Sequence, residues 1–153
     1  MSKAGTPWTL SSILLTGSGI LLTGSGILLI GMGIYFVLLR PPLLPEDIRF
    51  MNLTPAEVQS IGGRLGSWLV HVFRVMGGYI AATGVLAIAL AATSFREHHP
   101  FAAAGAMIGG AASIGWMAAV NFMIDSDFKW VLLGFALVWA VSLVTFVWEA
   151  ARS

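Results

Sequence analysis

One heptad is repeated almost three times near the start of the chain, as ILLTGSG (13–19), ILLTGSG (20–26) and ILLIGMG (27–33). The repeat lies in a charge-free run from Leu10 to Leu39, which is longer than the ~20 residues that a helix needs to cross the ~30 Å hydrocarbon core of a bilayer. We therefore predict that the repeat forms a membrane-spanning helix.

The repeat gives this helix two stripes of small and branched residues, about 200° apart at ~100° per residue. One stripe contains Ile13, Gly17, Ile20, Gly24, Ile27, Gly31 and Ile34, and the other contains Leu15, Gly19, Leu22, Gly26, Leu29 and Gly33. A lone four-helix bundle needs to bury only one of them. We predict that the second stripe docks a helix of another protein, and that leucine at Gly19 and Gly26 abolishes this association while the monomer still folds. The alternative is a neutral duplication, with both stripes facing lipid or the same bundle.

The composition places the whole chain in a membrane. Of its 153 residues, 58% are hydrophobic and only 10% are charged, and the mean hydropathy is +0.89, too apolar for an ordinary soluble domain. Eight Lys and Arg nearly balance seven Asp and Glu, so we expect no nucleic-acid partner. The absence of cysteine excludes disulfides, cysteine nucleophiles and Cys-ligated metal centres.

Four segments are long and apolar enough to span a bilayer, at about 10–39, 68–94, 101–124 and 130–148. None shows the alternation of barrel strands, so the spans are predicted to be helices. The predicted fold is all-α, an integral membrane four-helix bundle in a single domain, 1–153. Short connections after the second span make the last three helices antiparallel neighbours, and both termini lie on one face.

The one long loop lies between the first two spans. Arg40-Pro41-Pro42 ends the first helix, because proline lacks a backbone donor and disfavours helix at the residue before it. Thr54, Pro55 and Glu57 match a capping box. We predict a short interfacial helix that begins near Thr54 and lies on the membrane surface.

Glycine and tryptophan mark further surfaces. Small-xxx-small patterns let helices approach closely in lipid. The predicted helix-packing residues are Gly17, Gly19, Gly24, Gly26, Gly31, Gly33, Gly105 and Gly109. Most tryptophans lie at span ends, as expected for aromatic belts. Trp116 lies within a span, so its indole N–H needs a partner, either Thr83 or Ser113 or a ligand; ordinary packing is the favoured interpretation.

A polar pocket is predicted on the face of the long loop, from His71, Arg74, Asn121, Asp125 and Asp47. We expect Arg74 to pair with Asp125 or Asp47, since an unpaired guanidinium inside a span is costly. The favoured interpretation is that these residues staple helix ends and extend to headgroups. The alternatives are a pocket for a headgroup, a quinone or a small anion, and acid–base catalysis by His71.

No sequence motif indicates an enzyme or a carrier. The chain has no HExxH, Walker or GxSxG motif, and no carboxylate lies deep in a span, where ion-coupled carriers place one. We predict no catalytic residue, no metal and no cofactor, apart from a possible bound lipid or quinone.

Three segments carry a resemblance to a known group of proteins: LLPEDIRFMNL (43–53), WLVHVFRVMGGYIAATG (68–84) and GWMAAVNFMIDSDFKW (115–130). Over residues 34–148 the chain resembles small uncharacterised four-helix bacterial membrane proteins, and its layout is broadly similar to that of DoxX-like proteins, some of which are membrane subunits of redox complexes. The resemblance implies a fold and a bacterial inner-membrane location.

The leading functional hypothesis is a non-catalytic accessory or assembly subunit that packs against a larger membrane complex, or against its own copies, through the glycine-striped first helix. The alternative is a lipid- or quinone-binding protein, such as the membrane subunit of an oxidoreductase. Lys and Arg are nearly balanced between the two faces, with a slight excess on the loop face. Because Lys3 precedes the first span and the loop also carries acidic residues, we predict cytoplasmic termini.

Overall fold

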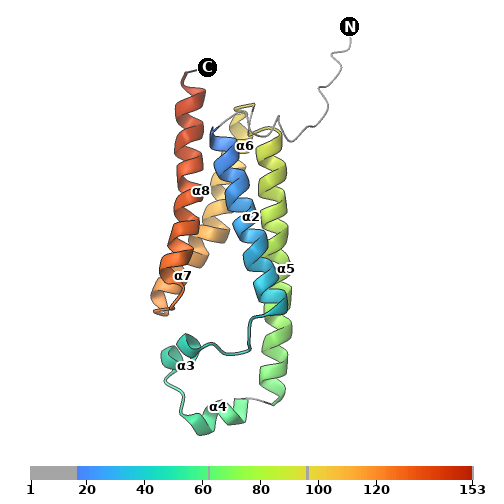
Figure 1. Ribbon diagram of the computed structural model, residues 1–153, viewed down its shortest axis with the longest axis vertical. Coiled ribbons are helices and arrows are strands. Elements are labelled where there is room, and N and C mark those ends of the chain that lie inside the picture. The colour runs from blue at the N-terminus through green and yellow to red at the C-terminus, as the bar shows by residue number, and fades with distance from the viewer. Residues whose placement is uncertain (1–16, 62, 96, 153) are drawn as a thin grey trace.

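The computed structural model describes residues 17–61, 63–95 and 97–152. Its four long helices are α2 (Gly17–Leu38), α5 (Arg64–Ala92), a third span running from Pro100 to Met123, and α8 (Lys129–Ala150). All four are long and apolar enough to cross a membrane, and they lie side by side as a bundle (Figure 1). The predicted multi-pass helical membrane protein is confirmed, although residues 10–16 of the first predicted span lie outside the described residues.

The third span contains a wide turn in its middle. It consists of α6 (Pro100–Gly110), the π-helical segment η1 (Ala111–Gly115) and α7 (Trp116–Met123). The backbone N–H of Trp116 donates to the carbonyl oxygen of Ala111, five residues earlier. Single π turns inside α-helices occur frequently at functional sites.

Two short helices occupy the long loop. α4 (Pro55–Ile61) begins where predicted: the Thr54 N–H donates to Glu57 Oε2 at 2.8 Å, and the Glu57 N–H donates to Thr54 Oγ1 at 3.4 Å. The helix α3 (Pro45–Met51) was not predicted. The residue before it is Leu44, which has no capping side chain, so its start is set instead by Pro45 and by a bond from the Leu44 N–H to Asp47 Oδ2 at 2.9 Å.

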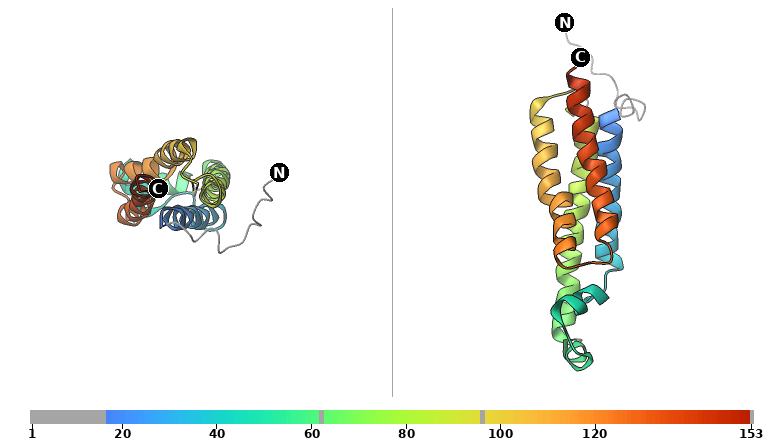
Figure 2. Two further views of the ribbon diagram at one scale, coloured as in Figure 1. Left: turned by 90° about the horizontal axis from the view of Figure 1, so that it is seen from above. Right: turned by 90° about the vertical axis from the view of Figure 1, so that its left-hand side faces the viewer.

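The two short helices lie beyond one end of the bundle, where α5 extends past the other spans (Figure 2). α5 has 29 residues, whereas α2 and α8 have 22 each. α4 has no buried residue and lies near the start of α5, at the opposite end of the bundle from the end of α8 (Figure 1).

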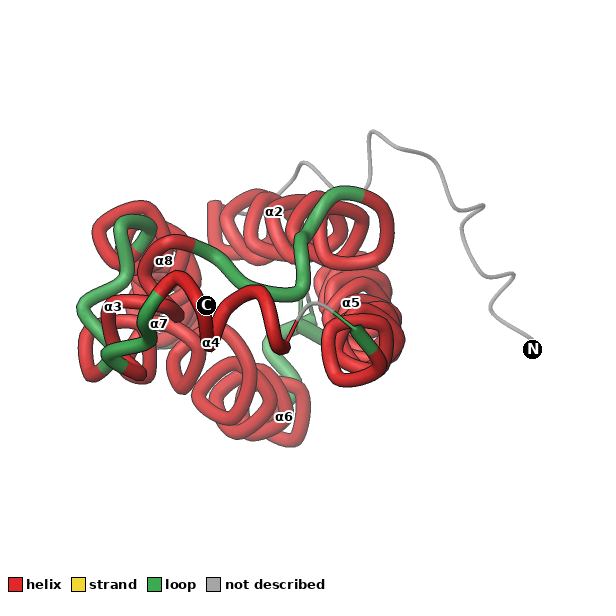
Figure 3. The backbone as a smooth tube through the Cα atoms, turned by 90° about the horizontal axis from the view of Figure 1, so that it is seen from below, coloured by secondary structure: helices red, strands yellow, loops and turns green. Residues whose placement is uncertain are grey.

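α2 packs mainly against α5 and secondly against α8 (Figure 3). A Cβ added at Gly26 would lie 2.7 Å from the carbonyl oxygen of Gly84, and one added at Gly33 would lie 2.6 Å from that of Gly77. The two backbones therefore touch directly, as small residues allow in membranes. This corrects the prediction for the second stripe. It packs against α5 of the same chain, so leucine at Gly26 would clash inside the monomer.

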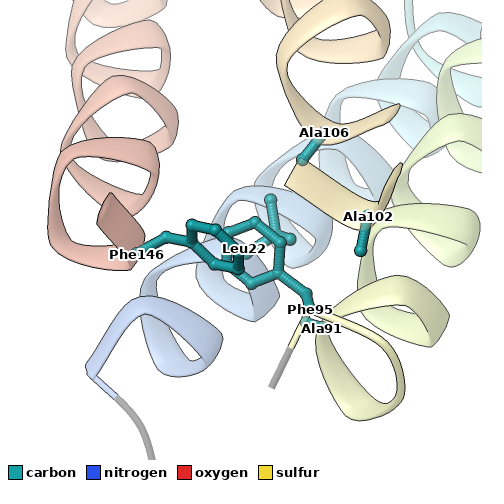
Figure 4. Packing of buried hydrophobic residues seen from close by; sticks show 6 residues of the cluster. All are labelled: Leu22, Ala91, Phe95, Ala102, Ala106 and Phe146. Atoms are coloured by element: carbon teal, nitrogen blue, oxygen red, sulfur yellow. The ribbon is translucent and has the colours of Figure 1, made fainter. Parts of the chain in front are cut away.

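A compact apolar cluster joins α2, α6 and α8 at the end of α5 (Figure 4). The rings of Phe95 and Phe146 lie 4.5 Å apart between centroids, and Phe95 is fully buried. The cluster consists of Leu22, Ala91, Phe95, Ala102, Ala106 and Phe146. Apart from this cluster α5 and α6 have few contacts, so a space remains between them.

Candidate functional site

The predicted polar residues do not share a partner. Asp47 pairs with Arg40 at 3.2 Å, and Asp125 pairs with Lys129, four residues later. Asn121 donates to the carbonyl oxygen of Met117 in its own helix at 2.8 Å. His71 and Arg74 are exposed on α5, and their side chains make no hydrogen bond or ion pair with another described residue. The predicted pairing of Arg74 with Asp125 or Asp47 is therefore wrong, because both carboxylates are bound by nearer cations.

Arg40 is the cation that the sequence interpretation overlooked. It follows the end of α2 and its side chain is only 9% exposed, with the guanidinium carbon 3.4 Å from the ring centroid of Phe73. Burial lowers the pKa of Arg40 from its ordinary value, and the neighbouring Asp47 carboxylate opposes part of that shift. Arg40 thus ties the end of α2 to both α3 and α5.

One ion pair and one hydrogen bond also fasten α3 to the turn between α7 and α8. Arg49 contacts Asp127 at 2.8 Å, and this hydrogen bond raises the pKa of Arg49. Ser126 donates to the buried Glu46 at 3.2 Å. These contacts give Glu46, Arg49 and Asp127 a structural role in holding α3 against that turn.

A second polar cluster lies at the opposite end and involves Glu149. Its Oε1 accepts from the Gly17 N–H at 2.8 Å and the Ser18 N–H at 3.3 Å, and its Oε2 accepts from Ser18 Oγ at 2.5 Å. His98 Nε2 lies 3.7 Å from Oε2. A carboxylate at the start of a helix satisfies free N–H groups and complements the helix dipole. Glu149 therefore joins α8 to Gly17 and Ser18 of α2. From the sequence alone, Glu149 was placed only at the end of a span.

A groove of about 770 Å³ lies between α5 and the α6–η1 segment. Its floor is formed by α2, and Trp139 of α8 stands at its back. Leu86, Gly105 and Gly109 are exposed, so the groove opens on the outer surface of the bundle. The other wall and floor residues are Leu22, Ser25, Leu29, Thr83, Ala87, Ala89, Leu90, Thr93, Ala106, Gly110, Ala112, Ser113 and Ile114.

Every hydroxyl group that lines the groove donates to the carbonyl oxygen four residues earlier in its own helix. The pairs are Ser25 to Leu21 at 3.1 Å, Thr83 to Tyr79 at 2.9 Å, Thr93 to Ala89 at 2.8 Å and Ser113 to Gly109 at 2.6 Å. The walls therefore offer a ligand mostly hydrocarbon, and no hydroxyl proton remains for an acceptor.

Trp139 is held in place at the back of the groove. Its indole N–H donates to the carbonyl oxygen of Ala106 at 2.9 Å. A Cβ added at Gly110 would overlap the indole ring, so only glycine lets the ring lie against this helix at that position. The close approach of Trp139 directly precedes the π turn of η1.

The predicted glycine interface divides into two groups. Gly19, Gly26 and Gly33 are buried within the bundle, and Gly17 faces Glu149 and Thr145. The remaining predicted glycines have no described atom within 4 Å of an added Cβ; these are Gly24, Gly31, Gly105 and Gly109. Gly24 and Gly31 lie on the outer face of α2, whereas Gly105 and Gly109 line the groove.

No group of three or more metal-ligating side chains occurs among the described residues. No protein-family model, no curated protein and no solved structure matches this chain. The resemblance to small four-helix bacterial membrane proteins therefore stays a prediction.

Proposed function

We propose that this protein binds the apolar chain of a membrane lipid in the groove between α5 and α6. The observation that carries the proposal is a groove of ligand size whose lining donors are all already bonded within the protein. A volume of about 770 Å³ falls in the usual range for small-molecule sites. Because these donors are already bonded within the protein, the groove selects a ligand by its shape and its apolar surface.

The groove opens on the outer surface of the bundle, beside the exposed Leu86, Gly105 and Gly109. In a bilayer the solvent at that depth is the hydrocarbon of lipid chains. A lipid chain is therefore the occupant that the surroundings supply.

The length of the groove suits a chain from a single leaflet. Its α5 wall runs from Thr83 to Thr93, which is about 15 Å at the helical rise per residue. This is half of the ~30 Å hydrocarbon thickness. A transmembrane helix from a partner would instead run across the full thickness, so length favours the lipid chain.

Filling the groove is expected to expel the lipid. In Gly109→Leu the new side chain meets no described atom within 4 Å at its Cβ, so it can enter the groove without disturbing the fold. We expect native mass spectrometry of protein extracted in mild detergent to show at least a tenfold lower lipid-bound fraction than in the wild type.

The matched control is Gly134→Leu on α8, which is equally free of neighbours at its Cβ and lies outside the groove. It should retain lipid as the wild type does. Equal lipid retention in all three proteins would refute the proposal, and a partner protein retained in place of lipid would assign the groove to a helix instead.

Helix docking on the outer face of α2 is the second candidate, and one observation favours it. Ile20, Ile27 and Ile34 are 45%, 58% and 49% exposed, and Gly24 and Gly31 between them are open. Projecting isoleucines that alternate with open glycines suit knobs-into-holes packing. On this proposal the protein is an accessory subunit of a larger membrane complex or a homo-oligomer.

The particle mass in detergent tests this second candidate. The double variant Gly24→Leu/Gly31→Leu should reduce a larger native particle to a monomer, as measured by sedimentation with correction for bound detergent. If the wild-type particle is already monomeric, the outer face of α2 does not dock another helix.

We also propose that the protein lies in a bacterial inner membrane with both termini in the cytoplasm. The resemblance and the distribution of Lys and Arg support this location.

A further inference from the structure

Two basic residues on the outer face of α5 are left without a partner inside the protein. The side chains of His71 and Arg74 make no hydrogen bond or ion pair with another described residue. The same holds for the side chain of Arg64, at the start of this helix. An unpaired guanidinium is costly in hydrocarbon. Arg74 therefore needs an acceptor from outside the chain.

The contacts of the neighbouring Phe73 place Arg74 at a membrane surface. The ring of Phe73 lies 3.4 Å from the guanidinium carbon of Arg40, which follows the end of α2 and pairs with Asp47. Arg74 therefore lies at the level where α2 ends and polar groups begin. α5 starts at Arg64 and extends past the other spans at this end (Figure 2), so the residues before Arg74 lie nearer to the headgroups.

The three basic side chains lie on one side of α5. At ~100° per residue, Arg64, His71 and Arg74 fall within about 80° of one another, and all three are exposed. Helical side chains lean toward the N-terminus of their helix, which for α5 is the end near α4. The guanidinium of Arg74 therefore leans toward the headgroups. Because α5 contains no Asp or Glu, this helix does not neutralise the charge itself.

We propose that Arg74 and His71 bind the phosphate of an anionic phospholipid at this surface, and that the charge of Arg64 adds to the attraction. A guanidinium matches phosphate with two parallel hydrogen bonds, and a ring N–H of His71 can donate another. A zwitterionic headgroup also carries an ammonium group, for which α5 offers no carboxylate. Charge complementarity therefore favours phosphatidylglycerol over phosphatidylcholine.

This phosphate site is separate from the groove. The α5 wall of the groove runs from Thr83 to Thr93, toward the other membrane surface, so the inference does not rest on the proposed function.

Lipid titrations followed by native mass spectrometry test this site. The full chain is held in mild detergent, and the probes are phosphatidylglycerol and phosphatidylcholine with the same palmitoyl and oleoyl chains. An arginine near a membrane surface contributes about fivefold to the affinity for anionic lipid. We expect the wild type to bind phosphatidylglycerol at least about fivefold more tightly than phosphatidylcholine. Arg74→Gln should remove most of this preference and leave phosphatidylcholine binding unchanged.

Arg49→Gln is the matched control, because it removes the same charge from the same end of the bundle, but from an arginine already paired with Asp127. It should keep the preference for phosphatidylglycerol. An equal loss of preference in Arg49→Gln and Arg74→Gln would show that net charge alone attracts the lipid, and the site would be refuted.

Gly109→Leu separates this site from the groove and should also keep the preference. Loss of the preference in Gly109→Leu would place the anionic lipid in the groove and overturn the site on α5. Equal affinity of the wild type for the two lipids would overturn it as well. If glycerol 3-phosphate binds as tightly as phosphatidylglycerol, the site takes a soluble phosphate and not a membrane lipid.

Discussion

Replacing Gly33 with leucine is expected to separate α2 from α5 and to destabilise the bundle by about 3 kcal/mol or more. The physical reason is backbone contact. A Cβ at this position would lie 2.6 Å from both the Ala81 nitrogen and the Gly77 carbonyl oxygen, and backbone atoms cannot move aside as a flexible side chain can. Loss of helicity during titration with sodium dodecyl sulfate, followed by circular dichroism, measures the change.

The matched control is Gly31→Leu, on the same helix but with no described atom within 4 Å of the added Cβ. We expect its unfolding midpoint to stay within experimental error of the wild type. Equal midpoints for the two variants would show that α2 and α5 are not in backbone contact and would overturn the helix pairing described above.

Removing the carboxylate of Glu149 is expected to have the second largest effect, about 3 kcal/mol in Glu149→Ala. Hydrogen bonds to a charged group contribute about 1.5–3 kcal/mol each, and the loss leaves several donors unpaired. The Gly17 N–H, the Ser18 N–H and the Ser18 hydroxyl all donate to this group. The same detergent titration measures the effect.

Glu149→Gln provides the control for side-chain volume. It keeps one acceptor oxygen but not the charge, so its stability should fall between those of the wild type and Glu149→Ala. If Glu149→Ala unfolds at the same detergent fraction as the wild type, Glu149 does not fasten α2 to α8.

The spans and the turns between them follow from local chemistry, which is why they could be predicted. Hydrocarbon requires long apolar helices with internally paired backbones, and the prolines at 41 and 42 stop the first one. The capping box of Thr54 and Glu57 is likewise formed by residues close together in the chain. The missed helix α3 has no capping side chain at Leu44, so local chemistry indicated it only through Pro45 and its acidic first turn.

The role of the glycine repeat could not be read from the chain. Both stripes of α2 have nearly the same composition, and which one is buried depends on the small residues that α5 presents, Gly77, Ala81 and Gly84. The Arg40–Asp47 pair and the Glu149 cluster likewise depend on distances between different elements. The groove depends on how far α5 and α6 separate.

By itself, then, the sequence determined that this is a multi-pass helical membrane protein, because hydrophobicity, proline and helix caps act within a few residues of chain. Only the tertiary structure decided that one stripe of α2 is internal and that a groove remains open beside Gly105 and Gly109. The physical reason is that van der Waals packing in lipid is set by the matching of two surfaces, and neither surface determines the match alone.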